Sequence, residues 1–164
     1  MWKATLALSF VSASAAASPD RTPYDVGRVT IHIGLYTHDT ALVGLRLGAG
    51  YNVIRGLELV LAEIHEWGIG GGSVETVEPF GVYHLTEWYE RFPLVPYVGL
   101  SYLHRWTTSP GFYVPEAVGM RGGVEYTITR QPSLLILGAG LQWNHPLEQD
   151  PEEVGPEVFA IFGF

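Results

Sequence analysis

Residues 42–53 read LVGLRLGAGYNV and decide the fold. Every second residue from Val43 to Val53 is apolar, and between them stand three glycines, Arg46 and Asn52. Successive side chains of a β-strand point to opposite faces, so this alternation predicts a strand with one apolar face and one small or polar face. Glycine weakens a strand unless close packing requires it, and its repetition here indicates a crowded second face.

The same period-two alternation recurs along the chain, between segments rich in Gly, Pro, Asn and Asp, and helical spacing is not seen. The facing of the fourth stretch, around residues 79–83, stays open. The pattern predicts an all-β chain that forms an eight-stranded antiparallel up-and-down barrel. We expect strands at 26–36, 42–53, 56–66, 75–85, 95–106, 115–128, 133–143 and 155–164.

Glycine on the second face favours a transmembrane barrel. An eight-stranded barrel has a narrow interior, where large side chains must be offset by residues without one, whereas a water-facing surface has no such need. The apolar face would then contact lipid. The alternative is a soluble secreted barrel that binds a small apolar ligand inside an apolar interior, as lipocalins do. The glycines in question are Gly34, Gly44, Gly48, Gly50, Gly99, Gly119, Gly123, Gly138, Gly140 and Gly163.

Aromatic residues near the strand ends keep the phase of the apolar face. Indole and phenol rings favour the headgroup level of a membrane, so we expect these residues to form interfacial girdles. They are Tyr51, Trp67, Trp106, Tyr126, Trp143 and Phe164. Outer loops are expected near 37–41, 67–75, 107–114 and 144–155, because connections there are mostly longer than the periplasmic turns between them. The loop at 37–41 is short and the turn at 86–94 is long, so these two depart from the rhythm.

The first residues have the order of a secretory signal peptide. Lys3 precedes an apolar run, and an Ala- and Ser-rich stretch follows it up to Ser18. We expect a signal peptide at 1–17, a periplasmic lead-in at 18–24 and the barrel at 25–164, with Sec-dependent export to a Gram-negative outer membrane. Removing Lys3, the only lysine, changes the net charge from −8 to 8 − 17 = −9.

Composition excludes several classes of function. The chain has no Cys, so it forms no disulfide, thiolate metal site or thiol nucleophile. Its acidic charge disfavours a nucleic-acid partner, because phosphate backbones attract basic surfaces. The length of 164 residues suits one domain.

Charged residues of both signs fall on the expected lumen face. A hydrogen-bonded Arg–Glu network is the expected arrangement, because an unpaired buried charge is severely penalised. A gated polar path along the axis is the functional alternative. The predicted network comprises Arg28, Arg46, Glu58, Arg121, Glu125 and Glu157, and Glu66 and Arg105 share its face.

Neither a metal, a cofactor nor a catalytic residue is predicted. The histidines lack metal-ligand spacing, and His104, Glu63 and His65 are expected near the outer rim, facing outward. An enzyme that hydrolyses lipid A acyl chains stays an alternative, but its His-x-Ser pattern is replaced by His38-x-Thr40 and His84-x-Thr86. An acidic cluster in the last loop is expected to be solvated, with cation-mediated contact to lipopolysaccharide as the alternative. It comprises Glu148, Asp150, Glu152 and Glu153.

Short motifs resemble those of the small outer-membrane β-barrels of the OmpA-, OmpX- and OmpW-like group. Residues 96–102, PYVGLSY, resemble its PYVG-x-G-Y strand, and residues 122–129, GGVEYTIT, resemble its G-x-G-x-E-Y-x-L-T strand and turn. The terminal Phe164 is similar to the signal that the barrel-assembly machinery reads. The resemblance implies a monomeric eight-stranded barrel with a filled lumen and outer loops that serve structural, adhesion or surface-interaction roles, or passage of small hydrophobic molecules. It also implies contact with outer-membrane lipid and lipopolysaccharide.

Overall fold

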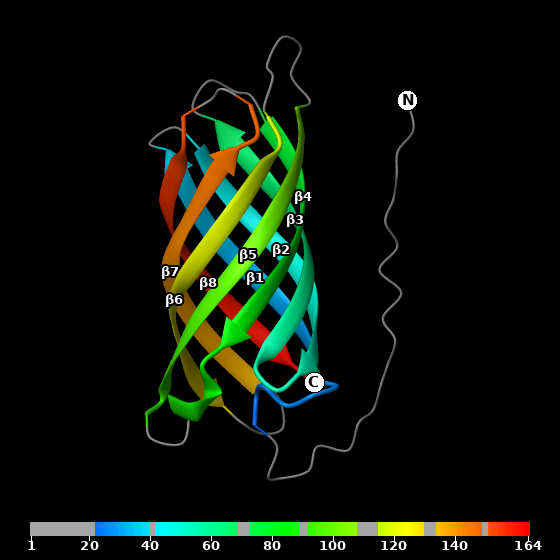
Figure 1. Cartoon of the computed structure of the whole chain (residues 1–164), viewed down its shortest axis with the longest axis vertical. Helices are drawn as coiled ribbons and strands as arrows, with labels where there is room; N and C mark the ends of the chain where they lie inside the picture. The colour runs from blue at the N-terminus through cyan, green and yellow to red at the C-terminus, as the bar shows by residue number, and fades with distance from the viewer. Residues whose placement is uncertain are drawn as a thin grey trace.

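The computed structural model describes residues 22–39, 42–68, 73–88, 92–107, 115–129, 134–148 and 151–164. Eight strands follow one another around a closed barrel, each antiparallel to its neighbours, and β1 pairs with β8 to close it (Figure 1). This confirms the predicted eight-stranded up-and-down barrel. A short 3-10 helix, η1 (Thr86–Trp88), follows β4. The strands are β1 (Val29–Asp39), β2 (Leu42–Ile54), β3 (Leu57–Gly68), β4 (Ser73–His84), β5 (Leu94–Thr107), β6 (Ala117–Thr129), β7 (Leu134–Pro146) and β8 (Glu153–Gly163).

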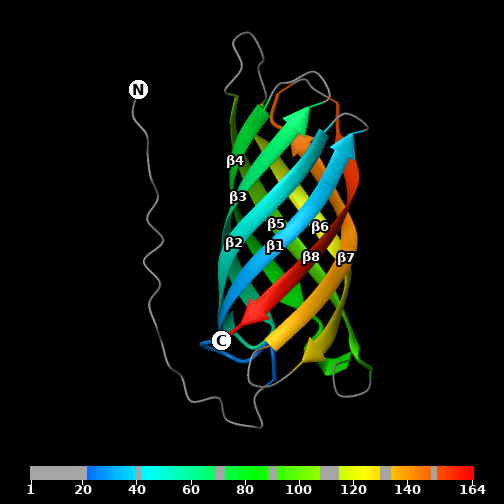
Figure 2. The ribbon, with the colours of Figure 1, turned by 180° about the vertical axis from the view of Figure 1, so that it is seen from behind.

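The two ends of the barrel differ. The start of β1 pairs with the end of β8, so both lie at one end, here called the terminus end, together with η1 (Figure 2). The opposite end, called the loop end, is where β1, β3, β5 and β7 finish. Among the described residues, no helix has the length and apolar character that crossing a membrane would require.

All predicted strand bounds agree with the structure to within three residues, and the start of the first strand is among the largest differences, at Val29 and not residue 26. Val26 and Gly27 form a turn, and Gly27 has a φ of +85°, in the left-handed region that glycine favours. The segment 22–28 instead lies across the terminus end. There the Tyr24 ring is buried, and the carbonyl of Tyr24 accepts a hydrogen bond from the Gly56 amide at 3.0 Å.

The apolar faces of the strands point outward. Leu137 and Val124 are 46% and 44% exposed, whereas Arg46 and Arg121 are 3% and 7% exposed. The same alternation settles β4, whose facing the sequence leaves open: Glu78, Phe80, Val82 and His84 point into the barrel. The polarity is therefore inverted relative to that of a lipocalin-like barrel, whose apolar face lies inside.

Close packing explains the glycines of the inward face. A Cβ atom on Gly44 would overlap the Tyr36 ring, and one on Gly138 would overlap the Phe159 ring. The interior is not uniformly polar, because two apolar clusters lie between the charged groups. One contains Val60, Ala62, Phe80, Val82 and Tyr97, and the other contains Tyr24, Val95, Leu134, Ile136 and Ile161.

Candidate functional site

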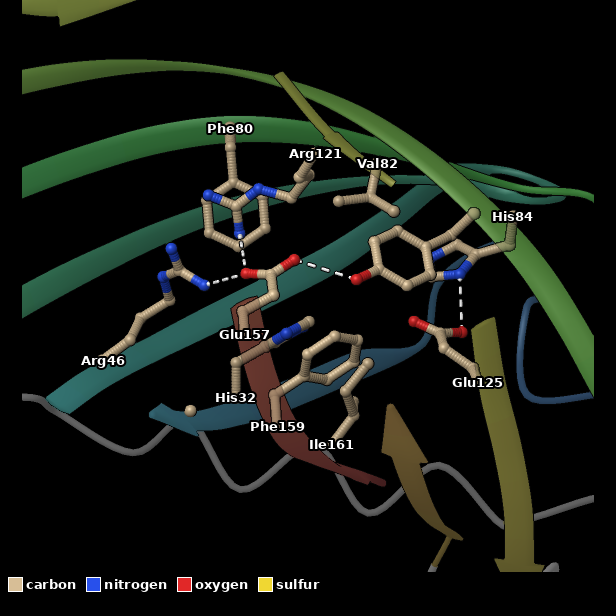
Figure 3. Close-up of a pocket in the computed structure, with 12 residues that line it drawn as sticks. His32, Arg46, Phe80, Val82, His84, Arg121, Glu125, Glu157, Phe159 and Ile161 are labelled. Atoms are coloured by element: carbon tan, nitrogen blue, oxygen red, sulfur yellow. Dashed lines mark hydrogen bonds and ion pairs between the residues drawn. The ribbon is translucent and has the colours of Figure 1, made fainter. Parts of the chain in front are cut away.

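The middle of the barrel holds two arginines and two glutamates, here called the middle layer. Arg46 Nε lies 2.9 Å from Glu78 Oε2. Arg46 Nη1 lies 2.7 Å from Glu157 Oε2, a contact that Figure 3 shows. Arg121 pairs with Glu78 and lies 3.8 Å from Glu157. The Arg121 guanidinium also stacks over the Phe80 ring, 4.0 Å from its centroid. The four charges balance, and each group has partners of opposite sign, which offsets the cost of burial.

Histidines replace arginines in the terminus layer, which is formed by Tyr24, His32, Glu58, His84 and Glu125. The His84 ring bridges two carboxylates, with Nδ1 2.9 Å from Glu125 Oε2 and Nε2 3.4 Å from Glu58 Oε2. His32 Nε2 lies 2.9 Å from Glu58 Oε1. Tyr24 covers this layer on the side of the terminus end. Its hydroxyl donates to Glu125 at 3.1 Å, and its ring lies 4.7 Å from the His84 ring.

The loop layer lies at the opposite end of the interior and comprises Tyr36, Glu66, Arg105, Asn144 and Glu153. Arg105 forms a bidentate pair with Glu153, at 3.0 and 2.6 Å. The Tyr36 hydroxyl donates to Glu66, and Asn144 Nδ2 donates to Glu153 at 3.2 Å. Glu153 was expected to be part of a solvated acidic loop, but it is the first residue of β8 and its carboxylate contacts the buried Arg105.

Charge balance differs between the layers. Among the described residues, five buried glutamates accompany three buried arginines, and the two glutamates of the terminus layer have histidines as partners. Between the middle and terminus layers lies a cavity of about 20 Å³, lined by His84, Tyr97, Arg121, Glu125 and Phe159 among others (Figure 3). That volume holds about one water molecule. The arrangement cross-links the strands and leaves little space inside.

The structure brings five of the six predicted network residues into the interior. Arg46, Arg121 and Glu157 lie in the middle layer, and Glu58 and Glu125 lie in the terminus layer. Arg28 is half-buried just before β1, where its Cδ lies close to Gly163. The six residues of the predicted network are Arg28, Arg46, Glu58, Arg121, Glu125 and Glu157.

Sequence reasoning missed further members of the interior, among them Glu78 and Tyr97. Glu78, which pairs with both arginines of the middle layer, was missed because the phase of β4 was open. Because Phe80 and Val82 are apolar yet point inward, the composition of β4 gives no signal of its phase. Tyr97, whose hydroxyl donates to Glu157 at 2.8 Å, lies in the predicted strand 95–106 in phase with Gly99 and Arg105, but the predicted network does not include it.

The predicted aromatics lie in two groups on the outer surface. Tyr51, Tyr126 and Phe164 are exposed at the terminus end. At the loop end, Trp67 and Trp106 are exposed and Trp143 is partly exposed. This is the placement that interfacial girdles require. The catalytic alternative His38-x-Thr40 lies outside the described side chains, and His84 is buried beneath Tyr24.

Comparison with known proteins supports the fold. No family model and no curated protein matches the chain. The N-terminal β-barrel domain of Pseudomonas aeruginosa OprF is similar in structure, with a TM-score of 0.63, 20% identity, and 85% of this chain and 98% of that chain covered. Neisserial surface protein A is similar with a TM-score of 0.54, 18% identity and coverage of 83% and 93%. A de novo designed transmembrane β-barrel is similar with a TM-score of 0.57, 16% identity and coverage of 85% and 98%.

The chain therefore has the fold of an eight-stranded transmembrane β-barrel. Its strand order, closure and outward apolar faces are those of this class. The resemblance of its short motifs to small outer-membrane barrels is confirmed at the level of the fold.

Proposed function

We propose that this chain is a non-enzymatic outer-membrane β-barrel, a membrane-embedded scaffold whose loop end serves structural, adhesion or surface-interaction roles. One observation carries the membrane assignment: large apolar side chains are exposed on all eight strands, while charged groups are buried inside. Contiguous apolar surface of this extent is unfavourable in water and is matched by hydrocarbon. The loops that would mediate surface contacts lie partly outside the described residues.

Heat-modifiable gel migration tests the membrane assignment. The chain is extracted from outer membranes in detergent and run with and without boiling, and a folded membrane barrel is expected to change its mobility on boiling. A control sample denatured in urea before loading should migrate the same with and without boiling. Recovery of the chain as a soluble pool without detergent would contradict the assignment.

The burial of His84 supports a non-enzymatic role. Both ring nitrogens face carboxylates and Tyr24 covers the ring, so a lipid acyl group has no route to this histidine. We expect membranes that contain the parent chain to show no lipid A deacylation. Deacylation that the parent produces and that His84→Gln or His104→Gln abolishes would overturn this part of the proposal.

The carboxyl-terminal residue supports recognition by the barrel-assembly machinery. Phe164 is exposed and continues the outward face of Val158, Ala160 and Phe162. Its backbone amide donates to the Val29 carbonyl at 3.0 Å, so the residue is fixed beside β1. We expect Phe164→Ser to lower the amount of heat-modifiable barrel in outer membranes, while Ile54→Ser, also exposed at the terminus end, leaves it unchanged.

A groove on the outer surface favours a second candidate function, the binding of small hydrophobic molecules. It has a volume of about 190 Å³ and is lined by Leu35, Val43, Pro156 and Val158. Pro156 has no backbone N–H, and the pairing of β1 with β8 ends beside it, at Tyr36 and Glu157. If the groove binds apolar dyes, Val43→Trp should weaken binding and Leu61→Trp, elsewhere on the outer face, should not.

A further inference from the structure

Three histidines on the outer surface share one geometry. In each, Nδ1 contacts a glutamate and the ring packs against a tryptophan two residues away. His104 Nδ1 lies 2.7 Å from Glu116 and its ring 5.8 Å from Trp106. His145 Nδ1 lies 3.4 Å from Glu152 and its ring 5.8 Å from Trp143. The third set pairs His65 Nδ1 with Glu75 and places its ring 4.6 Å from Trp67.

These three sets form a band at the loop end, here called the histidine belt. It comprises His65, Trp67, Glu75, His104, Trp106, Glu116, Trp143, His145 and Glu152. Each histidine lies within three residues of the end of its strand, on β3, β5 and β7, and is at least 36% exposed. Under the proposed membrane assignment, on which this inference rests, the belt lies at the headgroup level of the outer leaflet.

Among the described residues at the loop end, histidine is the only source of positive charge on the outer surface. The chain has one lysine, Lys3, in the expected signal peptide. Arg46, Arg105 and Arg121 are buried inside the barrel, Arg28 precedes β1, and Arg55 lies in the turn between β2 and β3 at the terminus end. The other three arginines, Arg21, Arg91 and Arg130, fall outside the described residues. Within the described residues, the outer surface at the loop end therefore gains cationic groups only when a histidine is protonated.

We propose that the histidine belt docks the phosphate-bearing headgroups of membrane lipids when its histidines are protonated. In the neutral state, Nδ1–H donates to the glutamate and Nε2 presents a lone pair, so each pair is net negative and repels a phosphate oxygen. Protonation neutralises the pair and turns Nε2 into an outward N–H donor. Charge-assisted N–H···O⁻ bonds of this kind are among the stronger hydrogen bonds.

A metal ion fits the belt less well than a lipid layer does. The histidines stand on alternate strands, and neighbouring strands lie about 4.8 Å apart, so successive rings are separated by roughly 10 Å. Ligands of one metal ion must converge within about 2 Å of it. Within the described ranges, no group of three His, Asp or Glu side chains is arranged to hold a metal. Single histidine N–H donors, spaced around the loop end of the barrel, match a row of separate lipid headgroups.

The groups that face each histidine are carboxylates, aromatic rings and aliphatic side chains. His65 faces Glu75 on β4, Leu45 on β2 and Glu63 two residues along its own strand. His104 faces Val77 on β4, Glu116 before β6, and Tyr102, whose hydroxyl also donates to Glu116. His145 faces Val118 on β6 and Glu152 before β8, and Trp143 Nε1 donates to Glu152 at 3.1 Å.

Lipid contact can be measured through the tryptophans of the belt. The full chain carrying Trp2→Phe and Trp88→Phe keeps only Trp67, Trp106 and Trp143 as indole fluorophores. It is placed in phosphatidylcholine bilayers that contain a fraction of nitroxide-labelled phosphatidylglycerol, whose phosphodiester stays anionic throughout. Labelled phosphatidylcholine serves as the reference. We expect the preference for phosphatidylglycerol to rise at least about threefold from about pH 8 to about pH 5.5, where imidazoles gain their charge.

Variants decide between the outcomes. The triple variant H65Q/H104Q/H145Q should lose the rise, while the control Glu87→Gln, exposed in η1 at the terminus end, should keep it. Heat-modifiable migration verifies that each variant is folded. A parent preference that does not change with pH, or a rise that survives in the triple variant, would overturn the proposal. Loss of the preference when inorganic phosphate is added at the same phosphate concentration would also overturn it, by identifying a free-phosphate site. Failure of the parent to enter the bilayer would instead contradict the membrane assignment.

Discussion

At the scale of single residues, the interior accepts side chains only where a neighbour leaves room. Gly138 faces the Phe159 ring, and a Cβ atom there would overlap it. We expect Gly138→Ala to lower the free energy of unfolding by about 1–3 kcal/mol, the usual cost of overpacking. The measurement is urea unfolding in lipid vesicles. Gly81→Ala is the control, because its Cβ would face outward, 3.6 Å from Leu59; equal losses for both variants would contradict the packing argument.

Glu78 joins both arginines of the middle layer and is fully buried. Replacing it by glutamine leaves two guanidiniums with Glu157 as the remaining carboxylate of that layer. We expect Glu78→Gln to lower the free energy of unfolding by about 3–5 kcal/mol, as when one partner of a buried ion pair is removed. Glu63→Gln, on the outer surface, should change it little. A loss for Glu78→Gln as small as that for Glu63→Gln would show that the layer is hydrated.

Glu116 precedes β6 at the loop end, outside the strands. Its pKa lies below the ordinary value, because the carboxylate accepts a hydrogen bond from Tyr102, which has the largest effect, and another from His104. The ionised form is favoured, so Tyr102→Phe should raise this pKa toward the ordinary value. An NMR titration of the Glu116 side chain measures the change. Tyr126→Phe, on the outer surface at the opposite end, is the control, and an unchanged Glu116 pKa in Tyr102→Phe would contradict the hydrogen-bond assignment.

At the scale of strands and layers, alternation made the fold predictable, because lipid-facing and interior residues differ in kind at every second position. Prediction failed where this contrast fades. In β4, Glu75 points outward and Glu78 inward, while Phe80 and Val82 are apolar residues that point inward, so composition does not reveal the phase. In segment 22–28, Tyr24 and Val26 are out of phase with the apolar residues of β1, and Tyr24 turns into the barrel. Partners across the interior, such as Arg105 with Glu153, depend on shear and side-chain length, which no local pattern records.

The outward face of each strand should tolerate charge according to depth. Leu47 is exposed in the middle of β2, and Val29 is exposed at the start of β1. In a bilayer, we expect Leu47→Arg to lower the free energy of unfolding by about 2–4 kcal/mol and Val29→Arg by about 0–1 kcal/mol, the depth dependence of lipid-facing arginine. Urea unfolding in vesicles measures both. If the two variants lose the same stability, these strands do not span hydrocarbon.

At the scale of the whole molecule, the three charged layers lie in series along the barrel axis. A solute that crosses must displace the Arg105–Glu153 pair, then the four charges of the middle layer, and finally Tyr24 at the terminus end. The cavity between the layers holds about one water molecule. If one end opens, the ion pairs of the middle layer remain across the path.

This series arrangement predicts the permeability of the barrel. Liposomes containing the parent chain should swell in an isosmotic solution of a small sugar no faster than protein-free liposomes, whereas an open porin accelerates swelling. Tyr24→Ala should remain closed, because the middle layer does not depend on the Tyr24 side chain. Rapid swelling of the parent would show that the interior conducts solutes and would revive the gated polar path. Rapid swelling of Tyr24→Ala alone would place the entire barrier at the terminus end. It would contradict the expectation that the ion pairs of the middle layer form a second barrier.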